Sequence, residues 1–71
     1  QRIFRDQQIP NFPEAVTNID WTDGCKILFS DGSWAICRFS GTEPVLRIAA
    51  EGNSLQQTRN YIQIWESFLK Q

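Results

Sequence analysis

The chain has 71 residues, which is enough for one small domain. Seven basic and eight acidic side chains give a net charge of −1, and this balance argues against a nucleic-acid or anionic-membrane partner, which would need clustered basic residues. No apolar run reaches the roughly 20 residues that cross a bilayer. Histidine, the usual general base and the commonest metal ligand, is absent, which disfavours a self-contained hydrolase or zinc enzyme.

The chain opens on Gln1 and contains no methionine, so we expect it to be a segment of a longer product. Residues 1–15 mix charged, amide and proline positions without a clear period, which predicts a lead-in or interdomain segment. The domain itself is predicted over residues 16–71.

Alternating apolar and polar residues predict four β-strands, at 16–21, 25–29, 34–38 and 45–51. Asp31-Gly32 lies between the second and third of these, and Asp-Gly is a strong signal for a two-residue hairpin turn. Such a turn pairs Phe29 with Trp34 and Ile27 with Ile36. The predicted arrangement is therefore a run of antiparallel strands.

In that register, Cys25 and Cys37 project from opposite faces of the sheet, because side chains alternate along a strand. A disulfide between them is disfavoured, and two free thiols favour a reducing compartment, so we predict a cytoplasmic protein. A thiolate nucleophile is also disfavoured, because neither cysteine has a histidine to activate it.

A helix is predicted from Ser54 onward, since Ser54 and Gln57 have the spacing of a capping box. Apolar residues then recur at helical intervals and form one wide face: Leu55, Thr58, Tyr61, Ile62, Trp65, Phe68 and Leu69. Strands followed by a helix predict an α+β fold, in which about four antiparallel strands carry the C-terminal helix on one face. The aromatic residues expected on the core side are Phe29, Trp34, Tyr61, Trp65 and Phe68.

The segment from Arg38 to Pro44 has more polar chemistry than folding requires. Gly41 lets the backbone turn so that its N–H groups converge on an anion, and Ser40 and Thr42 add hydroxyl donors. Arg38 can contact two phosphate oxygens at once, and Arg47 places a second cation on the following strand. These residues fit a site for a phosphate monoester, and on their own they also fit a polar turn that follows an arginine.

The segments Phe29-Ser-Asp-Gly-Ser-Trp34 and Arg38-Phe-Ser-Gly-Thr-Glu-Pro-Val-Leu-Arg47 closely resemble the C-terminal domain of the α-D-phosphohexomutases. That family contains the phosphoglucomutases, phosphomannomutases and phosphoglucosamine mutases. The resemblance runs from about Trp21 through the terminal helix and implies a fold like that of the TATA-box-binding protein. Phe39 departs from the pattern, since many members carry proline or a small residue there.

The resemblance implies that this domain holds the non-reacting phosphate of a hexose phosphate while phosphoryl transfer proceeds elsewhere in the same polypeptide. It assigns phosphate binding to Arg38, Ser40, Gly41 and Thr42, with Arg47 as a further cation. Glu43 matches the motif without a catalytic role, and bracing of the loop is one function it could have.

No segment of the chain resembles the family's reactive-serine loop or its acidic metal loop. The resemblance therefore implies that Mg²⁺ binds outside this chain, that hexose 1,6-bisphosphate is activator and intermediate, and that the 71 residues alone are inactive. The hexose phosphate and the other domains of the polypeptide are the expected partners. The alternatives are a phosphoglucosamine mutase and a free-standing module that binds a phosphorylated ligand without catalysis.

Overall fold

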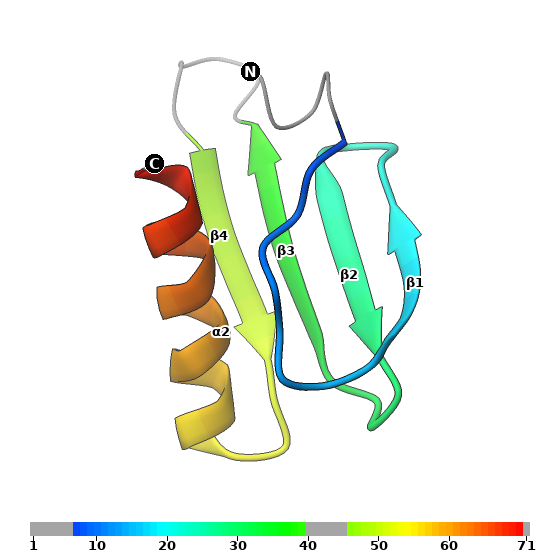
Figure 1. Ribbon diagram of the computed structural model, residues 1–71, viewed down its shortest axis with the longest axis vertical. Helices are drawn as coiled ribbons and strands as arrows, with labels where there is room; N and C mark the ends of the chain where they lie inside the picture. The colour runs from blue at the N-terminus through cyan, green and yellow to red at the C-terminus, as the bar shows by residue number, and fades with distance from the viewer. Residues whose placement is uncertain (1–6, 40–45, 71) are drawn as a thin grey trace.

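The computed structural model describes residues 7–39 and 46–70, which form four strands and one helix (Figure 1). Their bounds are β1 Val16–Asp20, β2 Cys25–Phe29, β3 Trp34–Phe39, β4 Leu46–Glu51 and α2 Leu55–Leu69. The strands form one antiparallel sheet in the order β1-β2-β3-β4, so every strand lies beside its neighbour in sequence. The predicted α+β fold is confirmed, with strand bounds close to those expected.

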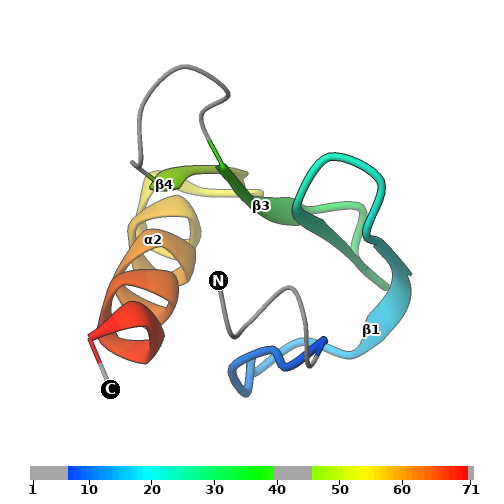
Figure 2. The same cartoon turned by 90° about the horizontal axis from the view of Figure 1, so that it is seen from above.

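The helix and residues 7–15 cover the same face of the sheet, and the sheet curves around them (Figure 2). A core of fully or nearly buried side chains fills the space between: Cys25, Ile27, Phe29, Ala35, Cys37, Tyr61 and Trp65. No described helix covers the opposite face, which we call the open face. Among the described residues, no helix is long and apolar enough to pass through a bilayer.

The turn between β2 and β3 has three residues, Ser30 to Gly32, and not the two predicted. The backbone N–H of Gly32 donates to the carbonyl of Phe29, and the N–H of Phe29 donates to the carbonyl of Ser33. Gly32 has a φ of +89°, which glycine adopts without strain and which is typical of this longer hairpin turn. The extra residue moves the pairing by one position, so Trp34 lies opposite Leu28 and not opposite Phe29.

The corrected register brings Cys25 and Cys37 together as direct partners across β2 and β3. The prediction that they lie on opposite faces was wrong, because a shift of one residue turns every side chain of a strand to the other face. Both thiols are free and fully buried. Burial raises the pKa of Cys25 to about 12 and that of Cys37 to about 11, so both stay protonated at neutral pH.

Trp34 was also assigned to the wrong face. It projects from the open face, where it is half-buried and the Lys26 ammonium lies 5.2 Å from the centre of its ring. Leu55, expected on the apolar face of the helix, is 67% exposed and does not belong to the core. The other predicted core aromatics, Phe29, Tyr61, Trp65 and Phe68, do pack on the core side.

Ser54 caps α2 as predicted, since its side chain accepts a hydrogen bond from the backbone N–H of Gln57. The Gln57 side chain reaches back to accept from the N–H of Asn53. Tyr61 and Trp65 then fall on the buried side of the helix. Tyr61 stacks on Phe29 with 4.7 Å between ring centres, which fixes the helix against β2.

Hydrogen bonds connect the hairpin turn to the helix through Asp31 and Ser33. The Asp31 carboxylate accepts from the backbone N–H and hydroxyl of Ser33 and from the side-chain amide of Gln57. The buried Ser33 hydroxyl also lies 2.7 Å from the Tyr61 hydroxyl, which donates to Glu14. The network therefore joins the lead-in segment, the hairpin and α2.

We expect the fold to lose stability in acid through Asp31. Hydrogen bonds from Ser33 and Gln57 lower the pKa of Asp31 to about 2, below the value of about 3.9 of an unfolded chain. A carboxyl with a lowered pKa stabilises the fold above the unfolded value and loses that contribution as pH falls toward the folded one. Thermal melts between pH 5 and pH 2 should show a decline that is shallower for Asp31→Asn; equal slopes for the two proteins would contradict the assignment.

Candidate phosphate-binding site

Two arginines lie opposite each other at the edge of the sheet where β3 ends and β4 begins. Arg38 and Arg47 are direct partners across these strands, and both are exposed on the open face. Their side chains point away from Leu46 and Ile48, which pack toward the core; for Arg47 this agrees with the alternation of apolar and polar residues along β4. Like charges placed opposite each other destabilise a sheet, so this pair favours an anion bound between or beside them.

The segment that joins the two arginines, residues 40–45, lies outside the described residues. The predicted phosphate ligands Ser40, Gly41 and Thr42, and the motif residue Glu43, all belong to it. The structure therefore places the two cations of the predicted site and leaves its hydroxyl and backbone donors as predictions from the sequence.

Gly24, in the turn between β1 and β2, packs directly on the backbone beside Arg38. A Cβ at Gly24 would lie 2.5 Å from the Cys37 carbonyl oxygen and 2.8 Å from the Arg38 Cα, closer than real contacts allow. Its φ of +129° also favours glycine. The dipeptide Asp23-Gly24 is typical of a turn. Its contact with β3 follows from the pairing of strands and has no local signal in the sequence.

Gly24→Ala should therefore lower stability by at least about 1 kcal/mol, since alanine fits neither the backbone angle nor the space. Gly32→Ala is the matched control, because Gly32 also has a positive φ but has open space where a Cβ would go. Urea unfolding should show the larger loss for Gly24→Ala. If Gly24→Ala loses no more stability than Gly32→Ala, the close contact between Gly24 and β3 does not limit the size of the residue at position 24.

The turn before β2 is held by its own hydrogen bonds. The Asp20 carboxylate accepts from the backbone N–H of Thr22 at 2.9 Å. A hydrogen bond from the Thr22 side chain, and then this backbone contact, lower the pKa of Asp20. The turn thus presents a fixed surface beside Arg38, and a cavity of about 530 Å³ lies between the two.

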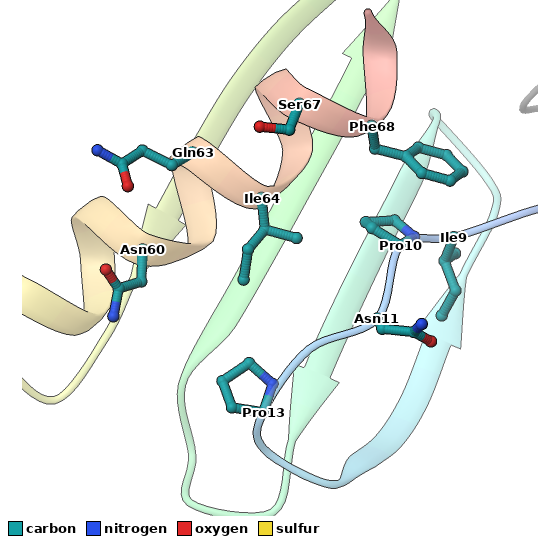
Figure 3. Close-up of a pocket in the computed structure, with 9 residues that line it drawn as sticks. All are labelled: Ile9, Pro10, Asn11, Pro13, Asn60, Gln63, Ile64, Ser67 and Phe68. Carbon is teal, nitrogen blue, oxygen red and sulfur yellow. The ribbon is translucent and has the colours of Figure 1, made fainter. Parts of the chain in front are cut away.

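A cavity of about 610 Å³ lies away from the arginines, between residues 9–13 and α2 (Figure 3). Its walls are apolar or uncharged, with Ile9, Pro10, Ile64 and Phe68 among them and the amides of Asn60 and Gln63 at its side. A phosphate dianion needs cationic partners, and none lines this cavity within the described chain. The arginine pair is the better candidate for an anion.

Within residues 7–39 and 46–70, no three His, Cys, Asp or Glu side chains come close enough to hold a metal ion. These residues therefore provide no fit for the Mg²⁺ that the family resemblance implies. Magnesium binding stays a prediction about segments outside this chain.

The family described as "Phosphoglucomutase/phosphomannomutase, C-terminal domain" matches residues 5–64. The match covers most of the chain, and the observed sheet and arginine pair are consistent with it. The chain belongs to this family and is its C-terminal domain.

Curated relatives support the same conclusion. A phosphoglucomutase/phosphomannomutase of Thermococcus kodakarensis is 45% identical over 53 residues, which are 75% of this chain and 11% of the relative. A probable phosphoglucosamine mutase of Methanosphaera stadtmanae is 45% identical over 47 residues, 66% of this chain and 10% of that protein. The chain thus spans about a tenth of the length of these relatives. No solved structure gives a significant match.

Proposed function

We propose that this chain binds the non-reacting phosphate of a hexose phosphate for a phosphohexomutase. The proposal rests on the exposed pair Arg38 and Arg47. These residues lie opposite each other on β3 and β4, one before and one after the segment 40–45. That segment reads Ser-Gly-Thr-Glu-Pro-Val and is predicted to add hydroxyl and backbone donors. Two cations and several donors suit a dianion of tetrahedral shape.

Each arginine contributes in a way that lysine cannot match. A guanidinium donates two parallel hydrogen bonds to two oxygens of one phosphate, which fixes the direction of the ligand as well as its charge. Binding energy from a phosphate remote from the reacting group can orient the reacting end of the sugar. Phosphoryl transfer, with its serine, Mg²⁺ and hexose 1,6-bisphosphate, is expected of the other domains of the same polypeptide.

The substrate class that we propose is a hexose phosphate or a hexosamine phosphate. Relatives of similar identity carry the names phosphoglucomutase/phosphomannomutase and probable phosphoglucosamine mutase. The arginine pair recognises phosphate, which all of these sugar phosphates share.

Binding is tested by NMR titration of the labelled chain with inorganic phosphate, glucose 1-phosphate and unphosphorylated glucose. We expect the two phosphorylated ligands to shift the signals of Arg38 and Arg47, more weakly at high salt, and glucose to leave them in place. Equal responses to glucose and its phosphate would overturn the proposed phosphate site.

The enzymatic part is tested on the natural gene product that carries this chain. We expect a polypeptide several times 8.2 kDa that interconverts hexose 1- and 6-phosphates. A product near 8.2 kDa that binds phosphate would instead support the free-standing binding module.

A further inference from the structure

The chain contains two Asp-Gly dipeptides, and the structure holds them in very different ways. Asp23-Gly24 lies in the turn between β1 and β2, and Asp31-Gly32 lies in the turn between β2 and β3. Asp-Gly is the aspartyl sequence most prone to form isoaspartate, because glycine has no side chain to shield its backbone nitrogen from the preceding carboxyl group. The surroundings of each dipeptide therefore decide where the folded chain undergoes this modification.

The reaction needs only the dipeptide and water. The glycine nitrogen bonds to the aspartyl Cγ, and its proton leaves with the hydroxyl of the neutral carboxyl group as water, which closes a succinimide ring. Water then opens the ring. Attack at Cγ restores aspartate, whereas attack at the main-chain carbonyl leaves isoaspartate, whose main chain runs through Cγ and is longer by one methylene. The product has the same atoms as the parent chain, so no oxidant or co-reactant is needed.

Hydrogen bonds hold Asp31 away from this reaction. The Ser33 hydroxyl, the Gln57 amide and the Ser33 backbone N–H all donate to its carboxylate. These bonds lower the pKa of Asp31 to about 2, so the neutral carboxyl group, the form that loses its hydroxyl, is rare at neutral pH. The Gly32 N–H donates to the Phe29 carbonyl, and this bond must break before the nitrogen can give up its proton.

Asp23 has no comparable hydrogen bonds. Its side chain is exposed, and within residues 7–39 and 46–70 no group donates to its carboxylate. The hydrogen bond that holds this turn, from the Thr22 N–H to the Asp20 carboxylate, ends one residue before Asp23. The Asp23 carboxyl group can therefore rotate toward the Gly24 nitrogen.

The first turn also has little room for a longer main chain. A Cβ at Gly24 would already lie 2.5 Å from the Cys37 carbonyl oxygen, whereas a Cβ at Gly32 would have nothing within 4 Å. Isoaspartate at position 23 adds its methylene to the main chain directly before Gly24. The turn then cannot keep its present contact with β3.

We propose that Asp23-Gly24 is the site at which the folded domain forms isoaspartate, that hydrogen bonding protects Asp31-Gly32, and that the conversion weakens the packing of the first turn on β3. This modification depends on the contacts of the two turns and is independent of the ligand that the arginines bind.

The test is to age the 71-residue chain in warm neutral buffer and to follow both dipeptides in one tryptic digest. Trypsin cleaves after Lys26, so Asp23 and Asp31 fall on the separate peptides 6–26 and 27–38. An isoaspartyl peptide has an unchanged mass and a changed retention time, and fragmentation locates the altered residue. We expect isoaspartate to accumulate at Asp23 at least about fivefold faster than at Asp31, because native structure slows reactions that require it to open.

The same chain in concentrated urea is the control for effects of sequence alone, since unfolding removes the hydrogen bonds of Asp31. Both dipeptides should then convert at similar rates. Asp23→Glu is the matched variant, because glutamate cannot close the five-membered ring; it should abolish conversion in the first peptide and leave the second unchanged. Equal rates at both dipeptides in the folded chain, or conversion at Asp23 only after unfolding, would overturn the proposed site.

Thermal melts of the purified isoaspartyl chain measure the effect on the turn. Asp23→Glu is again the reference, because it adds a methylene to the side chain at position 23 and leaves the length of the main chain unchanged. We expect the isoaspartyl chain to melt at a lower temperature than the parent, and Asp23→Glu to melt close to it. Identical melting of the isoaspartyl chain and the parent would overturn the proposed effect on packing.

Discussion

Trp65→Ala is expected to destabilise the domain by about 3–5 kcal/mol, the cost of removing a large aromatic side chain from a core. Trp65 is fully buried on α2 and contacts Phe12 and Phe68, with ring centres 6.3 and 6.0 Å away. It therefore connects the helix to the lead-in segment as well as to the sheet. Small domains have a stability of this order, so thermal and urea melts should show the variant largely unfolded near room temperature.

Two further variants separate the role of Trp65 from a general effect of losing tryptophan. Trp34→Ala removes the same residue type from the open face, where Trp34 is half-buried, and should cost much less. Trp65→Phe keeps an aromatic ring and removes the indole N–H, which is buried without a hydrogen-bond partner among the described residues, so it should cost less than alanine. A Trp65→Ala protein that melts within a few degrees of the Trp34→Ala protein would refute the packing described here.

Arg38→Ala is expected to weaken hexose phosphate binding by about 1.5–3 kcal/mol, the range for hydrogen bonds to charged groups. In terms of Kd, this is roughly a ten- to 150-fold increase. Arg38 is exposed, so the fold should survive the change. The variant also removes a like charge facing Arg47, which predicts stability equal to or slightly above that of the parent.

The control for Arg38→Ala is Arg59→Ala, which removes an exposed arginine from α2 and leaves the sheet end intact. Isothermal calorimetry or NMR titration with glucose 1-phosphate measures both variants, and circular dichroism checks their fold. We expect Arg59→Ala to bind as the parent does. Equal affinities for the parent, Arg38→Ala and Arg59→Ala would remove Arg38 from the site.

The helix and the strands, which depend on sequence patterns over a few neighbouring residues, were predicted close to their observed bounds. The Ser54 cap and the helical spacing of Tyr61 and Trp65 predicted α2, because capping and helical periodicity depend on residues within a turn or two of each other. Alternation predicted the four strands and placed Arg47 on the face opposite Leu46. The motif from Arg38 to Arg47 also predicted the family, which the comparison over residues 5–64 confirms.

The order of strands and helix, the family, and the two arginines of the candidate site were therefore all accessible from the residues alone. The hairpin register was not, because two- and three-residue turns both suit Asp31-Gly32 and the choice between them depends on which face of β3 packs under the helix. That choice paired Cys25 with Cys37 and turned Trp34 to the open face. The pairing of the strands also brings Gly24 and Asp23 beside Arg38. These residues are 14 or more positions away from Arg38 in sequence, so they come together only when β1, β2 and β3 pair.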